Sequence, residues 1–321
     1  MEPLIDQHGR IHDYLRISLT ERCNLRCTYC MPEEGVDLTP GSNICSYEEL
    51  LEIIDRFIEL GVKKIRITGG EPLVRKRVEQ IFEALGRRSP ELAITTNGLL
   101  LDRFMDVFES CGLRNVNVSL DTLDPAKFMM ITRRPGFEKV MKNIHALIDR
   151  GFHTKLNMVV MSGVNEDEIA DFAALARDLP LVVRFIEFMP FDGNRWDNTK
   201  MVPATEIRSR IESRFTLHKD EDSLHDTTKH YRIKGFEGRI GIISSMSEQF
   251  CGSCNRIRLL ANGSIKNCLF SGDETNLLQP LRNGENLEPI IRDSIYHKKA
   301  RHAGMFELAK SKNRSMITIG G

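Results

Sequence analysis

The sequence predicts an α/β fold, an incomplete (β/α)6 TIM-type barrel followed by a C-terminal β-rich capping region. Six β-rich runs alternate with amphipathic helical runs over the first two-thirds of the chain. Such alternation predicts a parallel sheet with right-handed crossovers, and six units instead of eight leave a barrel open along one side. A doubly wound open sheet gives the same alternation. A cysteine motif directly after the first run favours the barrel, because barrels carry their chemistry on the loops that follow the strands.

The expected strands and helix boundaries follow from local signals. The strands are Tyr14–Thr20, Lys63–Thr68, Glu91–Thr96, Asn115–Leu120, His153–Met161 and Leu181–Phe188. Ser46-Tyr47-Glu48-Glu49 predicts a capping box that opens a helix, and Gly61 closes that helix. Asn165-Glu166-Asp167-Glu168 predicts the same device with an asparagine cap. Gly112 and Gly151 indicate helix ends, and Pro203-Ala204-Thr205-Glu206 starts a sixth helix.

The pattern changes after roughly residue 230. His230–Ser245 and Asn255–Phe270 predict hairpins, and the second turns at Asn262-Gly263, a strong hairpin signal. Two short helices are expected around Asn276–Leu281 and Leu287–His297, and a polar, basic, mobile tail from Lys298.

Composition limits the class of protein. The 321 residues suffice for one large barrel or for two ordinary domains. Lys plus Arg and Asp plus Glu each number 45, so the neutral chain has no global attraction to nucleic acid or membrane. No run of eighteen apolar residues and no signal segment is present, which predicts a soluble, cytoplasmic protein. In that reducing compartment, eight cysteines indicate metal binding more than disulfides.

Cys23, Cys27 and Cys30 form a C-x3-C-x2-C motif, called here the first triad. Three thiolates can hold one face of an iron–sulfur cube and leave its fourth iron open to a small molecule, whereas clusters that only pass electrons have four cysteine ligands. A zinc site needs a fourth ligand, and none lies nearby in the sequence. Three clustered cysteines cannot all pair as disulfides. The first triad therefore predicts a [4Fe-4S] cluster and an enzyme.

Cys251, Cys254 and Cys268 form a second triad. One interpretation is a zinc ribbon completed by a distant ligand such as His230 or Cys111. The other is a second cluster whose open iron holds the substrate, and the presence of the first triad favours it.

Arg256 and Arg258 lie between the cysteines of the second triad, two apart on a strand and hence on one face, where guanidinium groups suit phosphate oxygens. An ideal two-residue turn at Asn262-Gly263 would put Cys268 opposite Ile257, on the other face. A bulge or a longer turn would realign it.

Polar and cationic side chains interrupt the expected strands at Arg16, Arg66, Thr95, Lys155 and Arg184. A parallel strand buried on both faces should be nearly all apolar, and an unpaired buried charge is expensive. Together these exceptions predict an anion-binding cavity inside the barrel.

The chain resembles known families at these motifs. The first triad with Tyr29 is typical of the radical S-adenosylmethionine (SAM) superfamily. The chain as a whole resembles the GTP 3′,8-cyclase (MoaA) family of molybdenum cofactor biosynthesis. Further segments of this resemblance are Tyr14–Thr20, Met31-Pro32, Gly69-Gly70-Glu71-Pro72, Thr95-Thr96-Asn97-Gly98, Ser119-Leu120-Asp121, Phe185–Pro190, the second triad with its arginines, and Gly320-Gly321.

The resemblance implies roles for individual residues. It implies that the first triad and the second triad each hold a [4Fe-4S] cluster, that SAM binds the first cluster, and that guanine meets the second. Binding of SAM is implied for Tyr29, Gly70, Ser119 and Met189. GTP contacts are implied for Arg16, Arg66, Thr95 (or Thr96), Lys155, Arg256 and Arg258. Catalytic roles are implied for Cys23, Cys27, Cys30, Arg256 and Arg258.

The implied reaction begins with reductive cleavage of SAM to a 5′-deoxyadenosyl radical, which takes hydrogen from C3′ of the GTP ribose. Attack on guanine C8 and reduction then give (8S)-3′,8-cyclo-7,8-dihydro-GTP. The implied partners are an electron donor, a downstream enzyme that forms cyclic pyranopterin monophosphate, and a second copy in a homodimer. We expect a barrel domain with the first cluster over residues 1–225, and the second cluster with the GTP site over residues 226–321. The Gly320-Gly321 tail is expected in the active site.

Two other functions compete with this interpretation. A radical SAM peptide maturase with an auxiliary cluster would share the first triad, but such enzymes usually carry more auxiliary cysteines. A zinc- and iron-binding scaffold would leave the glycine-rich strand ends and the buried cations unexplained.

Overall fold

Six parallel strands form the centre of the fold, and each ends within two residues of its predicted bounds. They are β1 (Tyr14–Ser18), β2 (Lys64–Thr68), β3 (Glu91–Thr96), β4 (Asn115–Ser119), β5 (His153–Val160) and β6 (Val182–Glu187). They pair side by side in chain order. The computed structural model describes residues 2–32, 34–88, 90–248, 250–303, 307–308 and 314–320. The predicted parallel, barrel-like sheet is therefore confirmed.

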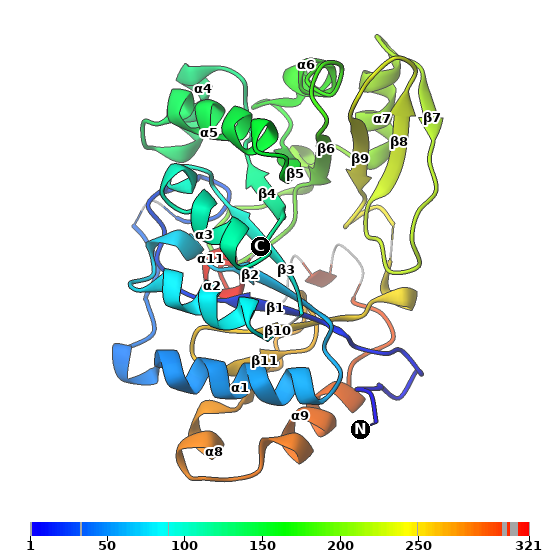
Figure 1. Ribbon diagram of the computed structural model, residues 1–321. Helices are drawn as coiled ribbons and strands as arrows, with labels where there is room; N and C mark the ends of the chain where they lie inside the picture. Colours follow the sequence, from blue (N-terminus) through cyan, green and yellow to red (C-terminus); the bar gives the residue numbers. More distant parts are fainter. Residues whose placement is uncertain are drawn as a thin grey trace.

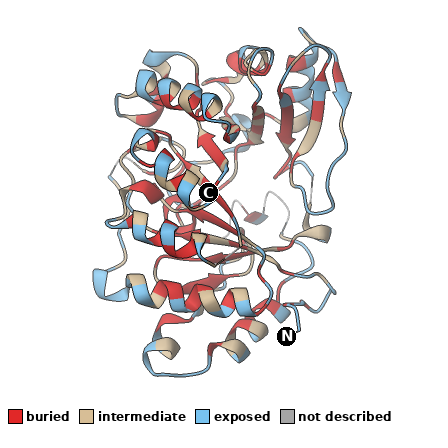
Figure 2. Ribbon diagram, viewed as in Figure 1, coloured by how far each residue is buried: buried red, intermediate tan, exposed pale blue. Residues whose placement is uncertain are grey.

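Helices cover the outside of the curved sheet (Figure 1). They are α1 (Tyr47–Glu59), α2 (Val78–Gly86), α3 (Met105–Ser110), α4 (Pro125–Thr132), α5 (Phe137–Asp149), α6 (Ile169–Ala174) and α7 (Ala204–Glu212). Short 3-10 turns lie at Gly41–Asn43, Pro72–Val74, Leu101–Arg103, Glu166–Glu168, Asn198–Lys200 and Cys251–Ser253. Figure 2 shows the core between the two layers: helix faces toward the sheet are buried and outer faces are exposed. None of these described helices is long and apolar enough to cross a membrane.

One predicted capping box is confirmed and the other is wrong. The Ser46 hydroxyl accepts a hydrogen bond from Glu49 N at 3.2 Å, and the Glu49 carboxylate accepts one from Ser46 N at 2.7 Å. Asn165 caps nothing. Its Oδ1 accepts from Met161 N at 2.8 Å, and its Nδ2 donates to the Asp121 and Val159 carbonyls. The Asn165 amide is hydrogen-bonded to backbone groups at the ends of two strands, so it does not cap a helix. The segment forms only a 3-10 turn before α6.

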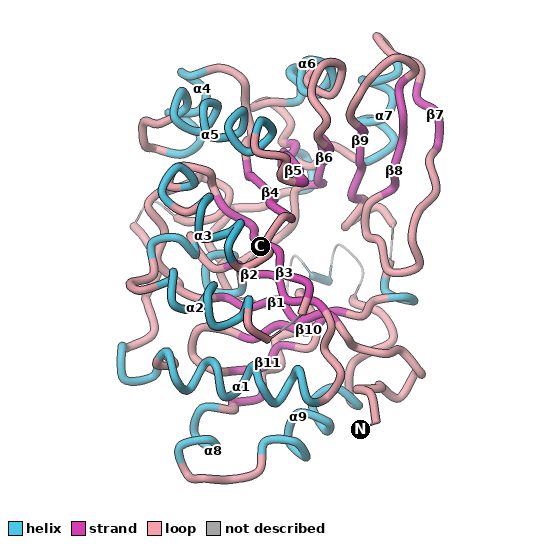
Figure 3. Tube along the Cα trace, in the orientation of Figure 1, coloured by secondary structure: helices cyan, strands magenta, loops and turns pink. Residues whose placement is uncertain are grey.

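The C-terminal β-rich region joins the sheet of the barrel at both edges. Its strands are β7 (Leu217–Lys219), β8 (Lys229–Ile233), β9 (Arg239–Ile243), β10 (Arg256–Leu259), β11 (Ser264–Lys266) and β12 (Thr275–Asn276). β9 pairs parallel with β6 at one edge, and β10 pairs parallel with β1 at the other. Figure 3 shows β10 beside β1 although the chain separates them widely. Its helices are α8 (Leu278–Arg282), α9 (Leu287–Tyr296) and α11 (Met316–Ile319).

The turn between β10 and β11 settles the orientation of Cys268. Arg258 pairs with Lys266, and Leu260 N donates to the Ser264 carbonyl at 2.9 Å, so three residues form the loop instead of two. Gly263 in this loop has a φ of 74°, which favours glycine. Continued past β11, the register brings Cys268 level with Arg256. The longer turn is therefore the one that the chain adopts.

The capping box of α1 gives a stability prediction. Ser46→Ala removes the hydroxyl that accepts Glu49 N, so the free energy of unfolding should fall by about 1 kcal/mol. Urea denaturation of the cluster-free protein, followed by circular dichroism, measures this. Ser42→Ala, an exposed serine outside any helix cap, is the control and should stay within about 0.5 kcal/mol of the parent. An equal loss in both variants would contradict the assignment.

Candidate active site

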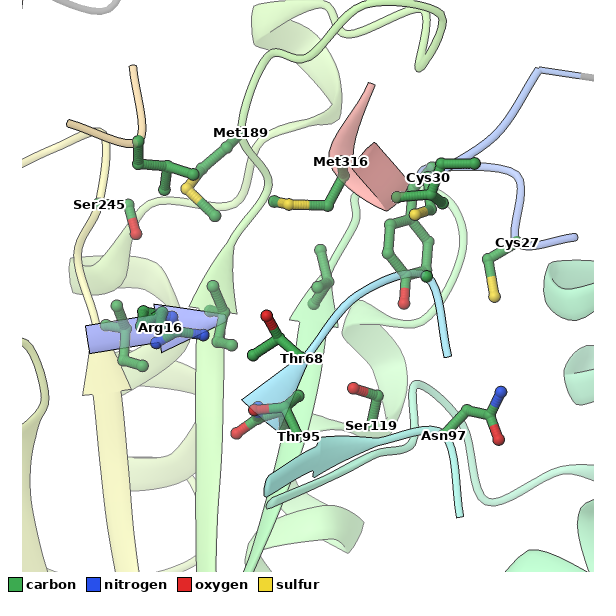
Figure 4. Close-up of a pocket in the computed structure, with 18 of the residues that line it drawn as sticks. Arg16, Cys27, Cys30, Thr68, Thr95, Asn97, Ser119, Met189, Ser245 and Met316 are labelled. Atoms are coloured by element: carbon green, nitrogen blue, oxygen red, sulfur yellow. The ribbon is translucent and has the colours of Figure 1, made fainter. Parts of the chain in front are cut away.

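A single cavity in the barrel interior is lined by all six cysteines of the two triads. The first triad follows the C-terminal end of β1. The second lies beside its N-terminal end, because Cys254 precedes β10 by two residues and Arg256, the first residue of β10, pairs with Tyr14. The triads therefore lie about one five-residue strand apart, on the order of 15 Å at ~3.3 Å per residue. Thr68, Thr95 and Ser119 also line this cavity, and Figure 4 shows their side chains together with Cys27 and Cys30 of the first triad.

The loop of the first triad is fixed to its surroundings by backbone hydrogen bonds. Arg26 N and Thr28 N donate to carbonyls at the end of α4, both at 2.9 Å. Cys23 Sγ accepts from Leu25 N at 3.4 Å, and Asn97 Nδ2 lies 3.8 Å from the same sulfur. Asn97 also donates to Asn24 Oδ1 at 2.7 Å. The segment Thr95-Thr96-Asn97-Gly98 is part of the family resemblance, but no local sequence signal predicts that Asn97 contacts a cysteine.

The donor chemistry of the first triad fits an electron-poor metal cluster. Burial raises the pKa of the Cys23 thiol to about 11, and burial with repulsion from neighbouring thiols raises the pKa values of Cys27 and Cys30 further. Cysteines bind metal as thiolates, so these buried thiols must lose their protons when a metal cluster binds. The positive charge of the metal ions favours that loss. Within the described ranges, no three His, Cys, Asp or Glu side chains converge on one metal ion. His230 and Cys111, the distant residues considered as a fourth zinc ligand, do not line the cavity.

The segment Gly69-Gly70-Glu71 is hydrogen-bonded to residues 20–22, which lead into the loop of the first triad. Gly70 N donates to the Thr20 carbonyl at 2.7 Å, and Glu71 N donates to the Arg22 carbonyl at 2.9 Å. A Cβ on Gly70 would lie 2.5 Å from the Arg22 carbonyl oxygen, so only glycine permits this approach. The sequence suggested that these glycines make room for SAM. The structure adds a second reason, which is contact with the segment that leads into Cys23.

Glu71 is fully buried behind the same loop. One carboxylate oxygen accepts from Leu73 N and from the Thr96 hydroxyl, and the other accepts from Asn97 N at 2.7 Å. Burial raises the pKa of this carboxyl to about 7, because these hydrogen bonds offset only part of the desolvation. Thr96 is therefore engaged in a structural role. In contrast, Thr95 Oγ1 is buried without a hydrogen-bond partner in the described part of the chain, so Thr95 is the threonine available to a ligand.

Three arginines form one row across the neighbouring strands β10, β1 and β2. Arg16 on β1 pairs with Arg258 on β10 and with Arg66 on β2. Arg16 lines the cavity, and its Nε has no partner among the described residues. Burial and the neighbouring Arg258 hold the pKa of Arg16 well below its usual range. Arg66 donates to the Tyr14 hydroxyl at 2.5 Å and to the Ile94 carbonyl at 3.1 Å. Such a row of like charges favours an anionic ligand.

The predicted GTP-contacting residues divide into two groups. Arg16, Thr95, Arg256 and Arg258 line the cavity, whereas Arg66 and Lys155 face the same side of the sheet without lining it. Burial and Arg184 lower the pKa of Lys155 to about 8, and burial and Arg66 lower the pKa of Arg184 to about 9. These shifts show that the two groups belong to one continuous positive field inside the barrel.

The predicted SAM-binding residues all line the cavity: Tyr29, Gly70, Ser119 and Met189. The Tyr29 hydroxyl donates to Asp121 Oδ2 at 2.7 Å, and Asp121 Oδ1 accepts from Val159 N at 2.9 Å. Burial raises the pKa of Asp121 to about 6. Met189 lies across the cavity from Cys27 and Cys30 (Figure 4).

Two parts of the site lie in segments that the sequence suggested were mobile. Lys298 is buried against the second triad, where its Nζ lies 3.4 Å from Cys254 Sγ. The tail also reaches the cavity: Met316 lines it, the Ser315 hydroxyl donates to the Cys30 carbonyl at 3.0 Å, and Arg258 donates to the Gly320 carbonyl. Gly321 lies outside the described residues. No local pattern marked Lys298, because its partner is distant in sequence.

Comparisons with known proteins agree with this geometry. The chain matches the Radical SAM superfamily over residues 17–176 and the family Molybdenum Cofactor Synthesis C over residues 181–304. It is 14% identical to SuiB of Streptococcus suis, with a TM-score of 0.62 over 91% of this chain and 68% of that chain, a likeness of fold alone. The partial barrel and the first triad thus define a radical SAM protein, a class that uses an iron–sulfur cluster and SAM.

Relatives identify the family within that class. The chain is 50% identical to the mitochondrial GTP 3′,8-cyclase of Arabidopsis thaliana, over 99% of this chain and 83% of that protein. It is 44% identical to the GTP 3′,8-cyclase of Syntrophomonas wolfei, over 99% of this chain and all of that protein. It is 51% identical to molybdenum cofactor biosynthesis protein 1 of Mus musculus, but spans only 51% of its length. The chain belongs to the GTP 3′,8-cyclase family.

The contact of Gly70 with the triad loop gives a prediction about cluster binding. Gly70→Ala places a methyl group against the Arg22 carbonyl, so the loop must shift and the first triad should lose its cluster. The reconstituted variant should hold about half the iron of the parent, measured by iron and sulfide analysis. Gly252→Ala is the control, because a Cβ at Gly252 meets nothing within 4 Å even though it lies in the second triad loop. Equal iron loss in both variants would refute the steric argument.

Proposed function

We propose that the protein is a lyase that converts GTP to (8S)-3′,8-cyclo-7,8-dihydro-GTP, the first step of molybdenum cofactor (molybdopterin) biosynthesis. One observation carries the proposal: both cysteine triads line a single cavity whose wall also carries Arg16, Arg256 and Arg258, and Arg16 Nε has no hydrogen-bond partner among the described residues. Family membership supports the same reaction. GTP has about four negative charges, which match this positive interior.

Cys23, Cys27 and Cys30 would hold the [4Fe-4S] cluster that binds SAM, and Tyr29, Gly70, Ser119 and Met189 would contact SAM. When bound, this cluster and SAM supply the 5′-deoxyadenosyl radical that takes hydrogen from C3′ of the ribose. The residues of the chain itself bind SAM and GTP and orient them relative to each other. Reactive radicals must be kept from water, and the position of the cavity inside the barrel suits this requirement.

Cys251, Cys254 and Cys268 would hold a second [4Fe-4S] cluster at the guanine end. Arg16, Thr95, Arg256 and Arg258 would contact GTP from the cavity wall, and Arg66 and Lys155 would extend the positive field. Arg256 and Arg258 would act as catalytic residues by fixing the nucleotide between the two clusters. We assign the first cluster to residues 1–225 and the second cluster with the GTP site to residues 226–321.

The partners follow from the reaction. An electron donor must reduce the first cluster, and a downstream enzyme must convert the cyclic product to cyclic pyranopterin monophosphate. A homodimer is the expected assembly. The peptide maturase alternative has no comparable support, since SuiB shares only the fold, whereas relatives at 44% and 50% identity are GTP 3′,8-cyclases.

Isotope transfer tests the proposed reaction. With reduced, reconstituted protein, SAM and GTP deuterated at C3′, deuterium should appear in 5′-deoxyadenosine, and GTP should strongly stimulate SAM cleavage. GTP deuterated at C2′ is the control and should transfer none. Cleavage indifferent to GTP would refute the substrate while keeping the superfamily assignment. No cleavage by protein that holds both clusters would refute the enzyme.

The tail gives a second prediction. Gly320 has a φ of 80°, and a Cβ there would overlap the Thr68 hydroxyl and lie 3.1 Å from Gly69 N. Gly320→Ala should therefore displace the tail and lower GTP cyclisation by on the order of 10- to 100-fold, with iron content retained. Gly284→Ala, with a φ of 74° and nothing within 4 Å, carries the same backbone strain without the contact. Equal activity in the two variants would remove the tail from the mechanism.

A further inference from the structure

Lys298 is a buried cation that points at the sulfur of a predicted cluster ligand. Its residue is 3% exposed, and its Nζ donates to the Arg256 carbonyl at 2.7 Å and to Cys254 Sγ at 3.4 Å. A lysine is rarely buried without a compensating charge. In the described part of the chain no carboxylate pairs with it, so the Cys254 sulfur is the partner best suited to balance its charge.

Positive charge gathers at one sulfur of the second triad. Lys298 Nζ lies 3.4 Å from Cys254 Sγ, and it also donates to the carbonyl of Arg256, two residues further along the chain. Cys254 is therefore the cysteine of this triad that the lysine contacts directly.

Arg10, in the turn at the N-terminus of the chain, fixes the segment that carries Lys298. Its Nη1 donates to the Cys251 carbonyl at 2.7 Å and to the Ala300 carbonyl at 3.0 Å, and its Nη2 donates to the Lys299 carbonyl at 2.8 Å. Arg10 Nε donates to Asp6 Oδ2 at 2.6 Å, which orients the guanidinium. One side chain therefore connects a cysteine of the second triad to both residues that follow Lys298.

The buried histidine of the same turn does not add a competing charge. His12 Nε2 lies 2.9 Å from Asp6 Oδ2, and burial and the charge of Lys298 lower its pKa to about 4. His12 is therefore neutral at physiological pH, and the cations around the second triad are Arg10, Lys298, Arg256, Arg258 and Lys266.

We propose that Lys298 tunes the second cluster, raising its reduction potential through a charge-assisted hydrogen bond to Cys254, and that Arg10 is the positioning residue that holds Lys298 in place. A donor and a positive charge at a ligand sulfur stabilise the reduced, more negative form of an iron–sulfur cluster. The inference rests on the second cluster of the proposed function, and it names the residues that set the reduction potential of that cluster.

The test is a redox titration followed by electron paramagnetic resonance. The full-length parent carries Cys23→Ala, Cys27→Ala and Cys30→Ala, so that only the second triad binds iron. Adding Lys298→Met should shift the midpoint potential to more negative values, whereas Lys298→Arg should stay close to the parent. Lys299→Met is the matched control, because its exposed side chain removes an equal charge from the adjacent position, and its potential should not shift.

The outcomes separate this inference from the proposed function. If Lys298→Met holds a cluster with an unchanged midpoint potential, the role of Lys298 is overturned and the second cluster is still supported. If iron analysis finds no cluster in the parent, both the role of Lys298 and the proposed second cluster are overturned.

A second measurement needs no variant of Lys298 and covers the case in which Lys298→Met fails to fold. With ¹⁵N-labelled lysine in the parent, pulsed electron paramagnetic resonance of the reduced cluster should detect hyperfine coupling to one lysine nitrogen. No such coupling overturns the proposal.

Discussion

The active site depends on the parallel pairing of β10 with β1, strands from opposite ends of the chain. This ladder sets Arg256 against Tyr14 and Arg258 against Arg16. It therefore places the second triad at the N-terminal end of β1, while the first triad occupies the loop at its C-terminal end. The separation of the two triads is thus set by a strand length, which backbone geometry holds constant.

The same ladder concentrates positive charge inside a neutral protein. Many other charged residues form ion pairs at the surface, as Arg150 does with Asp106 and Glu109. In the barrel, Arg16, Arg66 and Arg258 lie in one row. Burial and Arg258 lower the pKa of Arg16, and burial and Arg256 lower the pKa of Arg258 to about 10. Desolvated like charges destabilise the fold, so the interior is under strain that an anionic ligand relieves. Ligand binding and stability are thereby linked, and GTP should protect the protein from unfolding.

Local signals predicted the elements well and the long-range contacts poorly. Alternation of β-rich and helical runs located β1 to β6, because each run carries its own period and boundary residues. Asn165 misled the prediction because its amide serves two strand ends instead of a helix. The number of loop residues between β10 and β11, which decides the face of Cys268, depends on how β10 seats against β1. Thr95 and Thr96 became distinguishable only through the Glu71 carboxylate. The joining of the C-terminal strands to both edges of the barrel has no local signature at all.

The two triads also differ in the charges around them, and this difference suits a division of roles. Carboxyl groups lie near the first triad: Glu71 raises the pKa of Cys23, and Asp121 raises those of Cys27 and Cys30. Cations lie near the second, where Lys298 and Arg256 lower the pKa of Cys254. Negative surroundings favour loss of an electron from a cluster, and positive surroundings favour its retention. The two triads therefore lie in surroundings of opposite charge, although both open into the same cavity.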